Sequence, residues 1–212
     1  MAKQARSLAT RESLLRSAGR VFSEQGYAAT TLTDIVDAAG VTQGSLYFHF
    51  ESKHALASEL IVRQHANARA AIETVPTDGR GMDTIVLLTA VIAGQIADDP
   101  IVRGGMRLST ESPRDFPEVA SRPYEDWVVV CDAVLRRAVA EGDISADDDV
   151  VALARFVMSA FTGVQVVSQA LTQWDDLFPR LREMWQIILP SLLVHERHSE
   201  IPRLLAIIPA RA

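Results

Sequence analysis

The spacing of the apolar residues is the feature that most constrains the fold of this chain. Apolar residues recur at three- and four-residue intervals along almost the whole sequence, as "LLRSAGRVF" and "LARFVMSAFTGVQVV" illustrate. This interval places apolar side chains on one face of an α-helix, and signals for β-strands are scarce. With 212 residues, 48% of them hydrophobic, the chain can bury a substantial core. The sequence therefore predicts an all-α fold.

Capping residues mark the ends of the first two predicted helices. The first helix is predicted over residues 10–25 and ends at Gly26. The second is short, with Thr31 as its N-cap, Asp34 three residues later, and Gly40 at its end. The apolar stripe of the first helix consists of Leu14, Leu15, Ala18, Val21 and Phe22.

The remaining helices follow from the same signals. A third is predicted from the cap Thr42 through His49, and a fourth begins at Ser52 and runs to Ile72. Further helices are expected near residues 82–97, 100–111, 122–141, 147–171, 175–195 and 200–208. The segment "ESPRDFPEVASRP" at 111–123 contains three prolines and is predicted to be a surface loop. Two short helices joined by "AAGVTQG" make a helix-turn-helix, so a three-helix head should precede a larger helical domain.

Charge is distributed unevenly along the chain. Residues 1–53 carry six Lys or Arg side chains against five acidic ones, whereas the whole chain has a formal net charge of -6. The remaining 159 residues therefore account for -7. A near-neutral N-terminal part joined to an acidic remainder is compatible with local contact to nucleic acid.

Several features indicate a cytoplasmic protein. We see no run of about 18 apolar residues that would span a bilayer. The N-terminus lacks the apolar centre of a secretory signal. The single cysteine, Cys131, cannot form an internal disulfide and suits a reducing compartment as a small buried residue. Neither a cofactor nor a bound metal is expected.

The segment "VTQGSLYFHF" at 41–50 places small polar residues before a cluster of aromatic ones. A helix that lies in the DNA major groove needs small polar groups at its N-terminal end, where the base edges are. Behind them, Tyr47, His49 and Lys53 can donate to flanking phosphates. The residues predicted to contact DNA are Thr31, Thr42, Gln43, Gly44, Ser45, Tyr47, His49 and Lys53. Composition alone leaves the alternative that the aromatic residues are ordinary core of a helical bundle.

A longer segment, "TTLTDIVDAAGVTQGSLYFHFESKHAL" at 30–56, resembles the signature of the TetR family of bacterial transcription regulators. The all-helical remainder has the length and helix count that this family implies. The resemblance implies a repressor with a DNA-binding domain at 1–53 and a ligand-binding and dimerisation domain at 54–212. It also implies a homodimer on a palindromic double-stranded operator and a small-molecule effector.

Within that family the chain is most similar to the γ-butyrolactone receptors of actinomycetes, through "TTLTDIVDAAGVTQGSLYFHF", "VRGGMRLSTE" and "YEDWVVV". In this subgroup the resemblance implies a lactone effector and a tryptophan that lines the ligand pocket, here Trp127. Many relatives carry Lys at the position of Gln43. Glutamine can hydrogen-bond adenine but cannot supply the charge-assisted contact, so the operator preference is expected to differ.

Three polar side chains interrupt predicted inward faces and are candidate ligand contacts. Gln64 shares a face with Leu60 on the fourth helix, and Thr162 and Gln165 border the apolar stripe of the eighth. A buried amide or hydroxyl needs a partner, which a lactone or a hydroxyl group of a ligand can provide. The alternatives are a backbone carbonyl or an exposed edge for Gln64, and a back-bond to its own helix for Thr162. The expected apolar walls are Leu88, Ile92, Met106 and Phe161, beside Trp127.

The fourth helix is expected to transmit ligand binding to the head. Leu60 and Gln64 should touch the larger domain, while the start of the same helix carries the head. The last long segments, "VALARFVMSAFTGVQVVSQAL" and "DLFPRLREMWQIILPSLLV", carry more apolar surface than one buried face needs. Two copies are expected to form a four-helix dimer interface, with Gly163 permitting close approach.

An enzyme is the main alternative class, and the sequence argues against it. We find no HExxH, GxSxG or Gly-rich phosphate loop, and the five histidines form no recognisable ligand set. A second alternative keeps the fold and changes the ligand. Such a regulator would respond to an antibiotic, a butenolide or furan, another ligand, or none.

Overall fold

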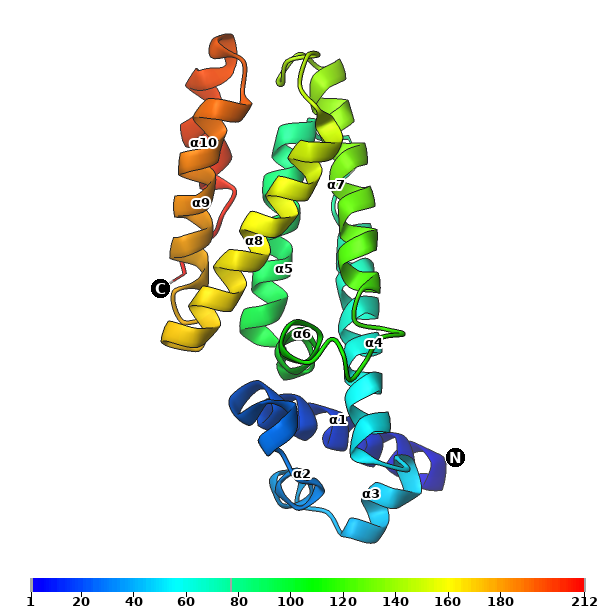
Figure 1. Ribbon diagram of the computed structural model, residues 1–212. Helices are drawn as coiled ribbons and strands as arrows, with labels where there is room; N and C mark the ends of the chain where they lie inside the picture. Colours follow the sequence, from blue (N-terminus) through cyan, green and yellow to red (C-terminus); the bar gives the residue numbers. More distant parts are fainter. Residues whose placement is uncertain (1, 77, 212) are drawn as a thin grey trace. The chain divides into compact units, whose positions relative to one another are not determined.

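The structure of the protein is a computed structural model that describes residues 2–76 and 78–211. Within these ranges every regular element is helical, which confirms the predicted fold class (Figure 1). The elements are α1 (Ala2–Ala29), α2 (Leu32–Ala39), α3 (Gln43–His49), α4 (Lys53–Glu73), α5 (Gly81–Asp98), α6 (Pro100–Glu111), α7 (Arg122–Ala140), α8 (Val150–Thr172), α9 (Leu177–Leu192), the 3-10 helix η1 (His195–Glu200) and α10 (Ile201–Ala206).

Two helix boundaries differ from the sequence prediction. α1 begins eight residues earlier than residue 10, at Ala2, and continues for three residues beyond Gly26. Gly26 nevertheless interrupts the helix as expected, because its backbone is in the left-handed region with φ 77°. The last predicted helix, 200–208, is shorter, and η1 precedes it.

The chain divides into two compact units that do not follow the expected boundary after residue 53. The first unit, here called the head, comprises Met1–Arg69 and Asp98–Pro123. The second, here called the body, comprises Ala70–Ala97 and Tyr124–Ala212. The head therefore includes α6 and most of α4, in addition to the helix-turn-helix.

The turns of the helix-turn-helix are built by side chains that the sequence predicts. The Thr31 N–H donates to the Asp34 carboxylate over 2.8 Å, and the Asp34 N–H donates to Thr31 Oγ1 over 3.2 Å, which completes a capping box. Gly40 ends α2 with φ 64°, a conformation that favours glycine. Thr42 caps α3 by accepting the Ser45 N–H over 3.2 Å. These local bonds fix where α3 begins.

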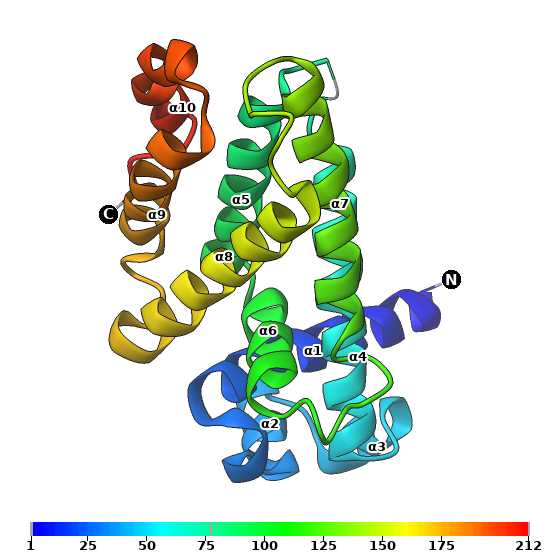
Figure 2. The same cartoon turned by 45° about the horizontal axis from the view of Figure 1, so that its top comes forward.

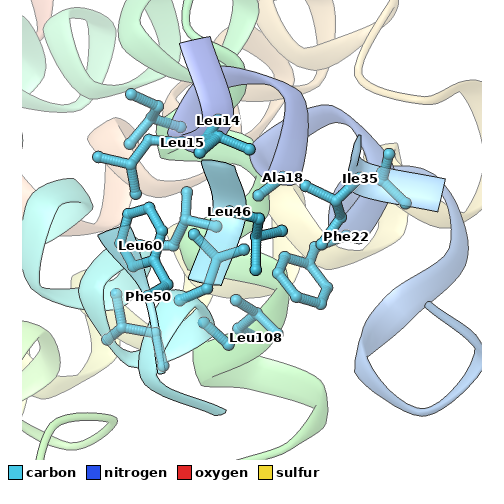
Figure 3. Close-up of a cluster of buried hydrophobic side chains, with 14 of the residues drawn as sticks. Leu14, Leu15, Ala18, Phe22, Ile35, Leu46, Phe50, Leu60 and Leu108 are labelled. Carbon is cyan, nitrogen blue, oxygen red and sulfur yellow. The ribbon is translucent and has the colours of Figure 1, made fainter. Parts of the chain in front are cut away.

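The core of the head gathers apolar side chains from α1, α2, α3, α4 and α6 (Figure 3). Leu46 of α3 lies at the centre of the labelled side chains in Figure 3 and is fully buried. Phe50 is also buried, so both side chains face inward as their four-residue spacing predicts. Burial of each contributes about 1.5–3 kcal/mol. The core thereby holds α3 against the rest of the head.

Glycines allow α6 to pack between α1 and α4, and both views show α6 beside α1 (Figures 1 and 2). A Cβ atom on Gly104 would lie 2.7 Å from the Cα and O atoms of Gly19 in α1. A Cβ atom on Gly105 would lie 2.8 Å from the Leu60 carbonyl oxygen in α4. Side chains larger than hydrogen do not fit at either position.

This packing shows which neighbours cover α4. Leu60 is fully buried in the apolar core of the head, and Gln64 packs beside Gly105 of α6. The sequence prediction placed both residues against the larger domain, predicted as 54–212, and α6 lies within that range. A helical stripe shows which side chains face inward, but it does not show which neighbour covers them.

Buried polar links hold the body together. The Trp185 indole N–H of α9 donates to Thr89 Oγ1 of α5 over 2.9 Å, and both residues are fully buried. The carboxylate of Asp143, which follows α7, is 1% exposed and accepts from Arg80 over 2.6 Å and from Arg197 over 2.7 Å. A buried carboxylate needs such partners, so Asp143 ties the start of α5 and η1 to the loop after α7.

Two helices, α5 and α8, are as long and apolar as a membrane span, although the sequence shows no unbroken apolar run. In α5, 61% of the apolar window is buried, which is typical of a core helix. In α8 the share is 28%. Both helices are mostly apolar and contain few charged residues, namely Asp83 and Asp98 in α5 and Arg155 in α8.

We expect Gly104→Ala to lower the free energy of unfolding by about 1–3 kcal/mol, because the added methyl group meets the backbone of Gly19. Gly94→Ala in α5 is the matched control, since a Cβ atom there has no neighbour within 4 Å. That control should be neutral or stabilising by up to about 1 kcal/mol. Urea denaturation of the two variants measures both effects, and equal stabilities would contradict the proposed close contact.

Candidate nucleic-acid interface and ligand site

The N-terminal end of α3 presents small polar groups to solvent. Thr42, Gln43 and Gly44 are exposed, and Ser45 is half-buried. Further along the helix, Tyr47 is 51% exposed. A Cβ atom on Gly44 would have no neighbour within 4 Å. The structure thus places the predicted base-contacting residues on one accessible surface, where no side chain blocks a close approach to a DNA groove.

Phe48 was not identified by the sequence analysis, although it is the most exposed large apolar side chain of α3, at 78%. Its ring lies edge-on to the half-buried His49 ring, with centroids 5.0 Å apart. The aromatic cluster of the sequence therefore splits in two. Phe50 belongs to the core, whereas Tyr47 and Phe48 belong to the surface.

Lys53 is held within the head in a way that the sequence does not reveal. Its ammonium group donates to the carbonyl oxygens of Tyr27 over 2.9 Å and Thr30 over 2.8 Å. The same group lies 4.5 Å from the centroid of the Tyr27 ring. An ammonium group has three N–H donors, so one is left for the predicted phosphate contact. Lys53 thus joins the end of α1 to the start of α4.

The Thr31 side chain lies at the exposed start of α2 and is engaged in the capping box. Its hydroxyl lies 2.7 Å from the Asp34 carboxylate. Hydrogen bonds from the Thr31 side chain and backbone lower the pKa of the Asp34 carboxyl below its usual value. A phosphate contact by Thr31 therefore has to share the hydroxyl with Asp34.

Two predicted ligand residues belong to the head. Gln64 of α4 is 6% exposed, and among the described residues its amide has no hydrogen-bond partner. No backbone partner is observed for Gln64 in the part of the chain that the structure describes, and its amide atoms retain some contact with solvent. Met106 of α6 is half-buried.

The other six predicted ligand residues belong to the body. Leu88 and Ile92 lie one turn apart on α5, and Phe161 lies on α8; all three are buried. Thr162 donates to the sulfur atom of Met158 over 3.7 Å and not to a backbone carbonyl. Trp127 of α7 is half-buried.

Gln165 lies one turn after Phe161 on α8 and is about as buried as Gln64. It is 7% exposed, and its amide has no partner in the described part of the chain. Both glutamines are mostly buried, although their amide atoms retain some contact with solvent. Both fall at positions that the sequence singled out.

The sequence analysis assigned no role to two further tryptophans, Trp174 and Trp185. Trp185 uses its N–H on Thr89, so it is satisfied core. Trp174 has φ 70°, is buried, and its N–H has no partner among the described residues. Trp185 lies on the inward face of α9, whereas Trp174 lies in the turn between α8 and α9, where helical spacing gives no information.

A shallow cavity of about 470 Å³ opens on the body between the end of α7 and the start of α8. It is lined by Arg136, Val139, Ala140, Ala146, Asp148, Asp149, Val150 and Val151. None of the predicted ligand residues lines it. Arg136 is paired with Asp132 over 2.8 Å, and Asp149 caps α8.

One face of α8 leaves apolar side chains in solvent. Phe156, Val166, Val167 and Leu171 are between 39% and 68% exposed, and Gly163 lies among them. Ile187 of α9 is 75% exposed. Contiguous exposed apolar surface of this kind marks an interaction site. It is the surface that the sequence assigns to a dimer interface.

Two segments of the chain match models of known protein families. Residues 14–60 match the model described as bacterial regulatory proteins, tetR family. Residues 80–194 match the model described as tetracyclin repressor-like, C-terminal domain. The second match alone covers more than half of the chain.

Among individual proteins, the chain is similar to the A-factor receptor protein of Streptomyces griseus, with 32% identity over 192 residues, covering 91% of this chain and 67% of that protein. A solved γ-butyrolactone receptor described as ArpA-like superposes with a TM-score of 0.83 at 29% identity, covering 96% of this chain and 98% of the other. CprB from Streptomyces coelicolor, solved with its operator sequence, gives a TM-score of 0.82 at 30% identity, with coverages of 95% and 96%.

We expect Thr31→Ala to destabilise the protein by about 1 kcal/mol, because it removes the cap of α2. Thr33→Ala, an exposed position within the same helix, is the matched control and should change stability by less than half as much. Thermal unfolding of the two variants at neutral pH measures the difference.

The same substitution should alter the pH dependence of stability. Because the folded-state pKa of Asp34 is lowered, its contribution is present above the ordinary aspartate value of about 3.9 and is lost as the pH falls below it. Thr31→Ala should therefore flatten the acid limb of the stability curve. An unchanged acid limb would show that the Thr31 bonds do not set this pKa.

Proposed function

The chain belongs to the TetR family of bacterial regulatory proteins, and we propose that it is a transcriptional repressor that a small signalling molecule, of the γ-butyrolactone type, releases from its operator. The observation that carries the first half is the accessible polar end of α3. The observation that carries the second half is the mostly buried Gln165, which lies one turn after Phe161 on α8 and has no hydrogen-bond partner for its amide among the described residues.

DNA reading is assigned to the exposed residues of α3. Gln43 can form two hydrogen bonds to adenine in the major groove, and Gly44 lets the helix approach closely. Tyr47 and His49 are placed to donate to phosphates, and Lys53 retains one donor for the same purpose. The similar protein CprB has been solved in complex with its biological operator sequence, which supports the same kind of partner here.

Assembly as a homodimer is assigned to the exposed apolar face of α8 and to Ile187 of α9. Covering this face with a second copy removes apolar surface from water, and an isologous contact needs only one such patch. A two-fold dimer presents two copies of α3 to successive major grooves, roughly 34–36 Å apart. A palindromic operator follows from that symmetry. We also propose a cytoplasmic location, because the similar protein CprB binds an operator sequence.

Effector binding is assigned to the predicted ligand residues. Within the body, lactone and hydroxyl oxygens can accept from the amide of Gln165 and from the Trp127 indole N–H. The apolar side chains of Leu88, Ile92 and Phe161 suit an acyl chain. Similarity to the A-factor receptor and to the ArpA-like γ-butyrolactone receptor supports a γ-butyrolactone as the ligand class.

We expect Gln43→Ala to relax the base preference at one position of each half-site, because it removes a bidentate contact worth about 1–3 kcal/mol of discrimination. Tyr47→Phe should instead weaken binding to all sequences by a similar factor, since its hydroxyl reaches the backbone. Binding of both variants to a set of single-base operator variants separates the two effects. Gln25→Ala, exposed near the end of α1, serves as a control that should change neither. A uniform loss for Gln43→Ala would contradict its role in base reading.

We expect Trp127→Ala and Gln165→Leu to reduce effector-driven release while leaving operator affinity without effector nearly intact. Typical couplings correspond to about a 5- to 150-fold loss of DNA affinity, so the wild type offers a measurable range. A gel-shift with a panel of γ-butyrolactones, furans and antibiotics first identifies a releasing compound. Gln169→Leu, one turn after Gln165 and with a partner of its own, is the matched control. Unchanged release would remove the substituted residue from the site, and loss of DNA binding without effector would show a structural role.

A further inference from the structure

We propose that residues 112–121, here called the strap, couple α7 to the DNA-binding head through Phe116, which acts as a positioning residue. The inference rests on the proposed function, because the movement that the strap transmits is the one that releases DNA. It assigns a role to a segment that the sequence predicts to be a plain surface loop. The proposal also gives a path by which ligand binding can affect the head without passing along α4.

The strap is anchored in the head by buried apolar side chains. Phe116 is 2% exposed and Ala120 is 3% exposed, and both belong to the core of the head. Most of the residues around them are exposed, as expected for a loop. Successive backbone bonds give the strap a defined shape, including Asp115 N–H to Ser112 O at 3.0 Å and Ala120 N–H to Phe116 O at 3.0 Å.

Phe116 contacts two helices whose ends carry the helix-turn-helix. Its ring meets the Tyr27 ring of α1 edge-on, with centroids 5.0 Å apart. It also stacks on the His54 ring of α4 at 4.9 Å, with 25° between the planes. The neighbouring Asp115 carbonyl oxygen lies 2.8 Å from His54 Nε2. Phe116 therefore contacts the end of α1 and the start of α4 at once.

Lys53 extends this contact to the DNA-reading surface. It precedes His54 in α4, lies over the Tyr27 ring, and donates to the carbonyl oxygens of Tyr27 and Thr30. Thr30 is followed by the cap of α2, and Lys53 follows α3 by three residues. Displacing Phe116 disturbs Tyr27 and His54, and through them the two ends of the helix-turn-helix.

The other end of the strap leads directly into α7. Arg122 begins α7, and Trp127, a predicted ligand contact, lies five residues further along. The chain passes between head and body at three places: within α4, before α6, and at the start of α7. A ligand that shifts the start of α7 pulls on the strap through a short covalent path. The strap then conveys this shift to Phe116.

A variant with a lengthened strap, here called the slack variant, tests the coupling. Gly-Gly-Ser is inserted between Ala120 and Ser121, which leaves every contact of Phe116 in place and lengthens the path to α7. The same insertion between Asp147 and Asp148, in the loop after α7, is the control. The operator is a DNA duplex selected from a random pool by the wild-type protein. Hydrogen exchange of residues 122–130 is measured with and without this duplex, since coupling between two sites is reciprocal.

The wild type and the control should show a change in exchange at the start of α7 on binding DNA, and the slack variant should show at most a third of that change. All three should bind the duplex within threefold of each other. Release by a synthetic 2-acyl-3-hydroxymethyl-γ-butyrolactone should fall at least threefold in the slack variant. Equal changes in exchange for the slack variant and the wild type would overturn the proposal.

Phe116→Leu provides a second variant, because it keeps an apolar side chain in the core and removes both ring contacts. It should reduce the exchange response at least twofold while thermal unfolding shows an intact fold. A wild-type response in this variant would show that Phe116 is core and nothing more. If the wild-type protein selects no duplex from the pool, the proposed function fails and the strap proposal falls with it. If the wild-type protein binds the duplex but hydrogen exchange at the start of α7 does not change, the strap proposal is wrong and the proposed function still stands.

Discussion

The close packing of α6 on α1, at Gly104 and Gly19, is the contact on which the head depends. It brings the Leu108 side chain of α6 into the same core as Leu46, so α6 shares the apolar surface that orients α3. On its other side Gly105 meets α4 beside Leu60. A close-packed core transmits a displacement and does not absorb it. The helix-turn-helix, α6 and the first part of α4 therefore behave as one piece.

This arrangement also explains how the DNA-reading surface stays both ordered and free. Caps at Thr31 and Thr42 and the left-handed Gly40 use local bonds to set the start of each helix. Leu46 and Phe50 hold α3 from behind. The side chains at its N-terminal end are then not needed for packing, which is why they can be small and polar. Lys53 is the exception, because it combines a structural bond with a position suited to a phosphate.

Sequence reasoning worked best where the signal is local. Caps, turn glycines and helical spacing predicted each helix from α2 to α8 to within a few residues, together with the inward-facing Leu46 and Phe50. It failed where the answer depends on which neighbour covers a face. The burial of Phe116 in the core that α6 shares with α1 and α4 is such a case, because no spacing reveals it. Gln64 and Gln165 lie between these cases: the pattern predicted that both face mostly inward, and among the described residues neither amide has a hydrogen-bond partner.

A head that moves as one piece limits how an effector can act on it. A ligand shifts the equilibrium between two states only by its different affinity for each state. A rigid unit has few alternative conformations between which a ligand can distinguish. The differences must then arise where the chain enters the head: along α4, at the start of α6 and at the strap. α4 spans both units, so bending it would cost helical hydrogen bonds. The strap has no such helical ladder, and its aromatic contacts on Tyr27 and His54 attach it directly to the head. Sequence changes in the strap can therefore tune the response to an effector without altering either the ligand contacts or the residues that read DNA.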